Sequence, residues 1–166
     1  MPEDKLHVVA IDGPVGVGKS SVARKLAQTI DFQYLDTGAM YRSVIWKAKQ
    51  ENSDPKSWSK EMLIKIAGNL KLQFQSSGHF FWQDQEITQA IRDEDISRNV
   101  FRAADIAEVR EQLVKRQQQM GKEKHSVLEG RDITTIVFPN AKWKFYLDAS
   151  PHERAKRRWL QLKDKG

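Results

Sequence analysis

Cysteine is absent from this chain of 166 residues, which excludes disulfide bonds and metal sites built on thiolates and makes a cytoplasmic setting the expectation. No uninterrupted apolar run reaches the roughly 20 residues that a membrane-spanning helix needs. The sequence also lacks internal repeats, low-complexity segments and linkers rich in proline, glycine or serine. We therefore expect one globular domain, residues 1–166, with a hydrophobic core of its own.

The charge balance is basic, with 28 Lys and Arg against 22 Asp and Glu and a formal net charge of +6. Such a balance suits an anionic partner, either a nucleic acid or a phosphorylated small molecule. The basic residues are spread along the chain instead of forming one tract, which weakens the nucleic-acid interpretation. We expect small-molecule substrates, no nucleic acid or membrane partner, and a monomer.

Hydrophobic periodicity predicts an α/β fold. Short apolar runs predict four strands, His7–Asp12, Phe32–Asp36, Ser126–Glu129 and Trp143–Asp148, of which the first and third are expected to be buried. Apolar residues at helical spacing predict helices from Lys19, from Gly38, over about Ile96–Met120, and from Ser150 to about Lys163. Strands that alternate with helices imply a parallel sheet flanked by helices.

Residues 70–87 have a different pattern of apolar and polar residues. The runs LKLQF and HFFWQ flank the turn sequence QSSG, a pattern typical of an antiparallel hairpin. We expect this hairpin to be a small insert into the α/β frame.

The segment GPVGVGKS, Gly13–Ser20, matches the phosphate-binding loop pattern G-x-x-x-x-G-K-[ST] and lies between a predicted strand and a predicted helix. Glycines let successive backbone N–H groups turn toward phosphate oxygens, and the helix N-terminus adds partial positive charge. Lys19 is expected to reach the β- and γ-phosphates of ATP, and Ser20 to ligate Mg²⁺. The predicted cofactor-binding residues here are Gly13, Pro14, Val15, Gly16, Val17, Gly18, Lys19, Ser20 and Ser21.

Polar residues follow the second predicted strand in LDTGAMYR, Leu35–Arg42. The carboxyl ends of parallel strands border the crevice where ligands bind in open α/β sheets, so Asp36, Thr37, Tyr41 and Arg42 become candidates for binding a phosphoryl acceptor. Tyr41 and Arg42 are expected in the first turn of the helix. A plain helix cap is the alternative role for Asp36 and Thr37.

Two further basic positions stand out. Stepping 100° per residue from Ile106 places Arg110 near the middle of an apolar arc, where a charge needs a partner, although a structural salt bridge or a snorkelling side chain would also explain it. On the last helix, Arg157 and Arg158 share one side with Arg154. These arginines either contact ATP phosphates or form a solvated basic face.

Six segments together resemble the bacterial cytidylate kinases: IDGPVGVGKSSVARKLA, YLDTGAMYR, ITQAIR, VREQLVKRQ, EGRDITTIVFP and FYLDASPHERAKRRWLQL. The resemblance covers nearly the whole chain. It implies transfer of the ATP γ-phosphoryl group to CMP or dCMP with ATP and Mg²⁺ as cofactors. It also implies that residues 38–100 form an acceptor-binding part of the domain, in which the hairpin insert of residues 70–87 covers the monophosphate.

Carried over to this sequence, the resemblance implies that Asp132 and Arg110 hydrogen-bond the cytosine edge, and that Arg131 and Arg42 hold the acceptor phosphate. A carboxylate that accepts from the exocyclic amine of cytosine finds an opposing carbonyl in uracil. Catalysis would consist of aligning two anions and neutralising the migrating group, with Lys19 and Arg131 as the catalytic residues.

The sequence departs from the resembled family at three points. Phe101 stands where the family usually has a serine that contacts the base, and Thr134 replaces a glycine of the string Gly-Arg-Asp-x-Gly-Thr. The family continues beyond position 166 into a mobile lid and a last strand–helix unit, so we expect this chain by itself to turn over little.

Three other functions remain open from sequence. A nucleotide-dependent switch without kinase activity would use the same loop and hydrolyse ATP slowly without an acceptor. A kinase of another small acceptor, such as shikimate, would fail to respond to CMP. RNA binding is weaker still and would show a steep salt dependence with long polymers.

Overall fold

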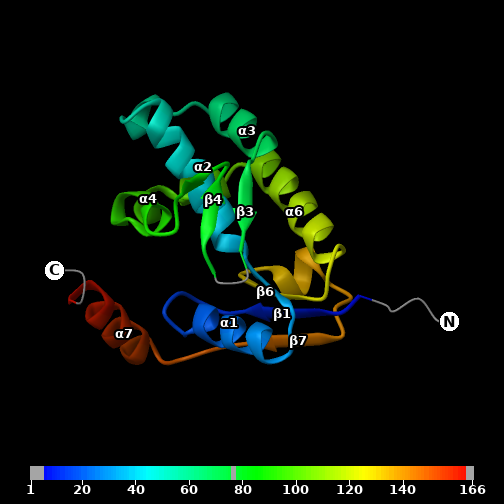
Figure 1. Cartoon of the computed structure of the whole chain (residues 1–166). Helices are drawn as coiled ribbons and strands as arrows, with labels where there is room; N and C mark the ends of the chain where they lie inside the picture. The colour runs from blue at the N-terminus through cyan, green and yellow to red at the C-terminus, as the bar shows by residue number, and fades with distance from the viewer. Residues whose placement is uncertain (1–5, 76–77, 164–166) are drawn as a thin grey trace. The chain divides into compact units, whose positions relative to one another are not determined.

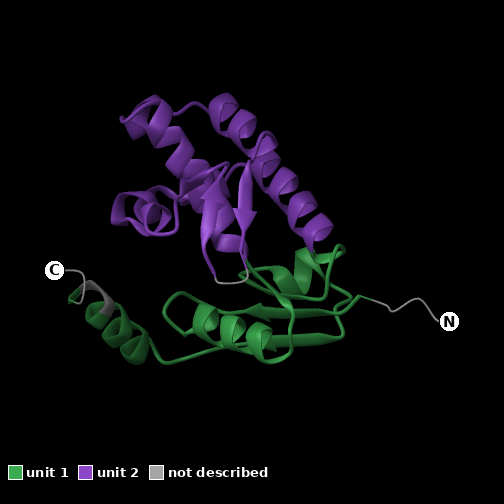
Figure 2. Cartoon of the chain, in the orientation of Figure 1, with its two compact units in different colours: residues 1–35, 121–166 green, residues 36–120 purple. Residues whose placement is uncertain are grey.

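The structure is a computed structural model that describes residues 6–75 and 78–163. The chain divides into two compact units (Figure 2): unit 1 comprises residues 1–35 and 121–166, and unit 2 comprises residues 36–120. Unit 2 is thus one continuous segment, whereas unit 1 is built from two. No helix within the described ranges is long and apolar enough to cross a membrane.

Unit 1 contains a four-stranded sheet with the order β2-β6-β1-β7. Its strands are β1 (Val8–Asp12), β2 (Gln33–Asp36), β6 (Ser126–Gly130) and β7 (Trp143–Tyr146). Both β6 and β7 run parallel to β1, which confirms the parallel sheet expected from the alternation of strands and helices. Every residue of β6 is buried, including Glu129, whose Oε1 accepts a hydrogen bond from the Tyr34 hydroxyl at 2.6 Å.

Helix α1 (Lys19–Thr29) follows β1 and packs with its small side chains against the sheet. Its buried residues are Ala23 and Ala27, whereas Val22 is exposed. Small residues at this contact allow the helix axis to approach the strands closely. The buried cluster of unit 1 consists of Val9, Ile11, Ala23, Ala27, Tyr34 and Val127.

Two short elements complete unit 1. The π-helix η3 (Ile133–Val137) follows β6 and was not expected from the sequence. Helix α7 (Pro151–Lys163) confirms the predicted last helix: Ser150 precedes it, and the Ser150 hydroxyl accepts a hydrogen bond from the Glu153 backbone N–H at 3.2 Å.

Unit 2 is mainly helical (Figure 1). Its helices are α2 (Thr37–Glu51), α3 (Lys60–Gly68), α4 (Glu94–Asn99), α5 (Phe101–Ala104) and α6 (Ala107–Gly121), with short 3-10 turns η1 (Pro55–Ser57) and η2 (Ala90–Arg92). A three-stranded antiparallel sheet contains β3 (Leu72–Phe74), β4 (Phe80–Trp82) and β5 (Gln85–Glu86). This sheet confirms the predicted antiparallel insert; Ser76 and Ser77 of its turn lie outside the described residues.

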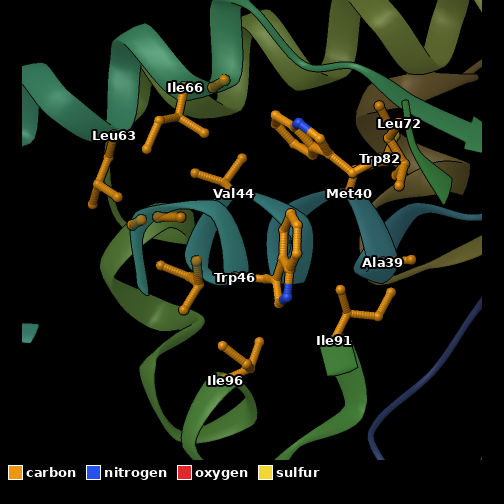
Figure 3. Packing of buried hydrophobic residues seen from close by; sticks show 14 of the residues in the cluster. Ala39, Met40, Val44, Trp46, Leu63, Ile66, Leu72, Trp82, Ile91 and Ile96 are labelled. Carbon is orange, nitrogen blue, oxygen red and sulfur yellow. The ribbon is translucent and has the colours of Figure 1, made fainter. Parts of the chain in front are cut away.

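The core of unit 2 surrounds α2 (Figure 3). Met40, Val44 and Trp46 of this helix are each at most 6% exposed, and the ring of Trp46 lies 5.8 Å from that of Trp82 on β4. Each fully buried side chain of this size contributes about 1.5–3 kcal/mol to folding. Unit 2 therefore has an apolar core that is separate from the cluster of unit 1.

The single long helix expected over Ile96–Met120 is wrong, because α4, α5 and α6 are separate helices. The Ile106 backbone N–H donates to Ala103 O at 3.4 Å, a step of three residues that ends the second helix. The Arg110 N–H then donates to Ile106 O at 3.0 Å and begins the third. Apolar spacing is the same in consecutive helices as in one long helix, so the pattern alone did not reveal the break.

Candidate functional site

The loop between β1 and α1 has the backbone conformation that its glycines permit. Gly13, Gly16 and Gly18 have φ values of 150°, 82° and 94°, in the region that side chains other than glycine rarely adopt. Gly18 is also the residue before α1 and carries no side chain to cap it. The N–H groups at the start of this helix are therefore left to other acceptors, as a bound phosphate requires.

Gly13 is further constrained by the neighbouring backbone. A Cβ at this position would overlap the carbonyl oxygen of Leu147 and lie 3.1 Å from its carbonyl carbon. Leu147 is held there because its N–H donates to Asp12 O at 2.8 Å, which extends the pairing of β1 with β7 by one residue. The first glycine of the motif is thus required by close packing as well as by its φ angle.

Lys19 and Ser20 are the first two residues of α1 and are half-buried. The Lys19 Nζ donates to Pro14 O at 2.9 Å, so the ammonium group lies over the loop that precedes it. Val15 is 62% exposed at the tip of the loop, while Val17 is buried. The arrangement agrees with a loop that holds phosphate through its backbone and one lysine.

Helix α7 lies against this loop. Arg157 Nη1 donates to Val17 O at 3.0 Å, and a Cβ on Gly16 would come within 3.2 Å of the backbone oxygen of Arg154. Both arginines predicted to contact ATP phosphates are exposed, and Arg157 is the one that a hydrogen bond holds beside the loop. The contact agrees with a phosphate-binding role for Arg157.

Arg131 and Asp132 directly follow β6, and the register explains their location. Gly130 at the end of β6 pairs with Asp12 at the end of β1, so both loops leave the same edge of the sheet at the same level. Arg131 is exposed and Asp132 is half-buried. The structure thus brings the Arg-Asp pair to the edge from which the phosphate-binding loop starts.

Asp12 is a residue of this region that sequence reasoning missed. Its carboxylate is buried, and it accepts hydrogen bonds from Ile133 N at 2.9 Å, Thr134 N at 2.8 Å and Thr134 Oγ1 at 2.6 Å. A carboxylate at the end of an otherwise apolar buried strand was the available signal, because such a group needs donors.

In unit 2, Asp36 precedes α2 and has two partners. Its Oδ1 accepts from Ala39 N at 2.9 Å, which confirms that it caps the helix, and its Oδ2 accepts from Arg42 Nη2 at 2.7 Å. Thr37 is buried and Tyr41 is half-buried. Since α2 begins at Thr37, Tyr41 and Arg42 lie in the second turn of the helix and not in the first, as the sequence had suggested.

Arg110 lies toward one edge of the buried stripe of α6 and not in its middle. The buried residues of this helix are spaced four apart, at Val109, Leu113, Gln117 and Gly121, while Ala107 is exposed and Arg110 is half-buried. The predicted arc was too wide because it extended as far as Ala107. Arg131 and Asp132 belong to unit 1, whereas Asp36, Thr37, Tyr41, Arg42 and Arg110 belong to unit 2.

The residues near the loop fit a Mg²⁺ ion held largely by phosphate oxygens. Among residues 6–75 and 78–163, no group of three or more His, Cys, Asp or Glu side chains could hold a metal by itself. Mg²⁺ in nucleotide sites characteristically takes one or two protein oxygens and completes its shell with phosphates and water. Ser20, in the first turn of α1, is placed to supply such an oxygen.

A parallel sheet with a glycine-rich loop between its first described strand and first helix defines an α/β protein of the phosphate-binding-loop class. The family model for cytidylate kinase matches residues 9–166. The chain belongs to the cytidylate kinase family.

Its relatives include cytidylate kinases and bifunctional pantoate ligase/cytidylate kinases. A cytidylate kinase from Caldanaerobacter subterraneus subsp. tengcongensis is 42% identical over 158 residues, which cover 95% of this chain and 69% of that protein. A cytidylate kinase from Shouchella clausii is 44% identical over 161 residues, covering 95% of this chain and 71% of the relative. A bifunctional pantoate ligase/cytidylate kinase from Synechococcus sp. is 46% identical over 165 residues, which cover 96% of this chain and 30% of that protein.

Proposed function

We propose that this chain catalyses transfer of the γ-phosphoryl group of ATP to CMP or dCMP, giving ADP and CDP or dCDP. The observation that carries the proposal is the geometry of the Gly13–Ser20 loop within a chain whose residues 9–166 match the cytidylate kinase family. In such a reaction the acceptor phosphate is already ionised, so the protein has to align two anions and neutralise the charge of the migrating group.

The donor side of the proposal rests on unit 1. The backbone N–H groups of the loop and of the start of α1 bind the ATP phosphates, and Lys19 exchanges the carbonyl of Pro14 for the β- and γ-phosphate oxygens. Arg157, already beside Val17, adds a second positive charge. Mg²⁺ bound through Ser20 would supply further neutralisation of the phosphate oxygens.

The acceptor side of the proposal assigns one task to each charged group. The Asp132 carboxylate accepts a hydrogen bond from the exocyclic amine of cytosine, with Arg110 as a second contact to the base. Arg131 and Arg42 bind the acceptor phosphate, for which the guanidinium group offers two parallel donors. Asp36 orients Arg42 through their hydrogen bond, and Thr37 and Tyr41 complete the lining.

An acceptor panel tests the reaction. The chain is mixed with ATP and Mg²⁺, and ADP release is followed with CMP, dCMP, UMP, AMP, shikimate or no acceptor. We expect release that depends on CMP or dCMP. ADP release at the same rate without any acceptor would instead indicate a nucleotide-dependent switch. Release only with another acceptor would show that this molecule, and not CMP or dCMP, is the substrate.

The variant Asp132→Asn tests how cytosine is selected. The Asn amide N–H can donate to the carbonyl of uracil, whereas the amide oxygen is a weaker acceptor for the cytosine amine than the carboxylate is. We therefore expect kcat/KM for CMP to fall by about tenfold or more while the ratio of UMP to CMP turnover rises, since a matched base contact is worth about 1–3 kcal/mol. Asp31→Asn is the matched control, because Asp31 is exposed in a turn with φ 55°, which Asn tolerates. An unchanged UMP to CMP ratio in Asp132→Asn contradicts the assignment.

A further inference from the structure

The Asp12 carboxylate caps the N-terminus of η3, a role that usually belongs to the residue directly before a helix. The first N–H groups of a helix have no partner within it and are commonly bound by the side chain of the preceding residue. For η3 that residue is Asp132, and its side chain makes no capping hydrogen bond. Instead, the N–H groups of Ile133 and Thr134 donate to the carboxylate of Asp12, which lies on β1, far away in the sequence.

Thr134 strengthens this connection through its side chain. Its hydroxyl donates to Asp12 Oδ2 at 2.6 Å, and its backbone N–H donates to the same oxygen at 2.8 Å. Both carboxylate oxygens of Asp12 are thus occupied by donors of two adjacent residues. Hydrogen bonds to a buried carboxylate are shorter and stronger than those between neutral groups, so the turn after Asp132 is held firmly.

Asp12 is itself immobile. It is 2% exposed, its backbone pairs with Gly130 of β6 and Tyr146 of β7, and its carbonyl oxygen accepts from Leu147 N. The residue that follows it is Gly13, the first of the phosphate-binding loop. One side chain therefore links the start of that loop to the turn that carries Arg131 and Asp132.

We propose that Asp12 and Thr134 are positioning residues for the acceptor: by capping η3 from β1 they fix the backbone after Asp132, so that Arg131 and Asp132 meet the nucleotide in one orientation. The role rests on the proposed function, because it assumes that these two side chains bind the acceptor. Neither Asp12 nor Thr134 touches the reacting atoms in this scheme. Their contribution is to KM for the acceptor and much less to KM for ATP.

The variant Thr134→Val tests the role, because valine keeps the shape and the backbone N–H while it removes the hydroxyl donor. We expect KM for CMP to rise about tenfold, as loss of one hydrogen bond to a charged group costs about 1.5–3 kcal/mol, with KM for ATP within about twofold. Thr134→Ser should restore most of the CMP affinity. Thr135→Val is the matched control, since Thr135 is exposed in the same helix and its hydroxyl makes only a 3.5 Å contact to Asp132 O.

Hydrogen–deuterium exchange gives a readout that does not depend on catalysis. In Asp12→Asn, a donating amide replaces one accepting oxygen, so the amides of Ile133 and Thr134 should lose protection while the β1–β6 amides keep theirs. The positioning role is overturned if KM for CMP is unchanged in Thr134→Val. It is also overturned if KM for CMP and KM for ATP rise equally in this variant and its melting temperature falls. A wild-type chain without CMP-dependent ADP release overturns the proposed function and this role with it, whereas the exchange data still report whether the cap exists.

Discussion

The substitution Gly13→Ala provides a stringent test of the loop geometry. The new methyl group would overlap the carbonyl oxygen of Leu147, whose neighbouring N–H is tied to Asp12 O. Because the atoms of Leu147 that the methyl group would meet all belong to the backbone, no side-chain rotation can relieve the collision. Either β7 separates from the end of β1, or the loop abandons its conformation.

The size of the effect can be worked out against Gly18→Ala. Both glycines have positive φ, and a strained backbone conformation costs on the order of 1–3 kcal/mol. At Gly18 the nearest atom to an added Cβ is Arg157 Nη1 at 3.8 Å, an ordinary contact. At Gly13 the collision adds an overpacking cost of about 1–3 kcal/mol, so Gly13→Ala should lose roughly 2 kcal/mol more than Gly18→Ala.

Urea unfolding followed by circular dichroism measures this difference. We expect midpoints in the order wild type, Gly18→Ala, Gly13→Ala, with similar slopes, which would show that the native state and not the unfolded ensemble was changed. ATP binding should fall in both variants, since both alter the loop. Equal free energies of unfolding for the two variants would refute the assignment of a backbone collision at Gly13.

Three further outcomes are expected. Lys19→Met should lower kcat at least about 100-fold with little loss of stability, measured by ADP release and urea unfolding, because it removes charge compensation at the migrating group. Arg157→Met should weaken ATP binding in calorimetry more than Arg158→Met, since only Arg157 has a contact with the loop in the structure; equal losses would argue against that distinction. The Lys60 ammonium, 2.6 Å from Glu108 Oε1, holds the pKa of that carboxyl below its usual 4.5, so the stabilisation by this pair is present above that value and is lost as the pH falls through the lowered pKa. In Lys60→Met, an NMR titration should return the Glu108 pKa toward 4.5, and an unmoved pKa would exclude Lys60 as the cause.

The sheet of unit 1 and helix α7 were predictable because each signal is local. A strand buried on both faces is a largely apolar run, as in β1, and the Ser-Pro-x-Glu start of α7 specifies both its cap and its first turn. The placement of Arg131 and Asp132 at the loop edge also follows from local information once β6 is recognised, since polar groups at the carboxyl end of a parallel strand meet there.

The remaining features do not follow from the local pattern of apolar residues. The cap of η3 by Asp12 joins residues whose proximity follows only from the pairing of β1 with β6. The break between α5 and α6 depends on a change of hydrogen-bond step at Ile106, which leaves the apolar spacing intact. Arg110 was placed in the middle of a stripe because helical periodicity does not tell which apolar residues, such as the exposed Ala107, stay outside the core.

The division of the chain has a consequence for the order in which it folds. Residues 36–120 form an uninterrupted segment with its own apolar cluster, so their contacts close short loops at small entropic cost. The sheet that bears the phosphate-binding loop cannot close until Val8 meets Ser126, after that whole segment has left the ribosome. The nucleotide loop is thus synthesised before unit 2 but acquires its shape only after it. A substitution in unit 2 that slows folding would therefore reduce ATP binding without changing any residue that contacts ATP.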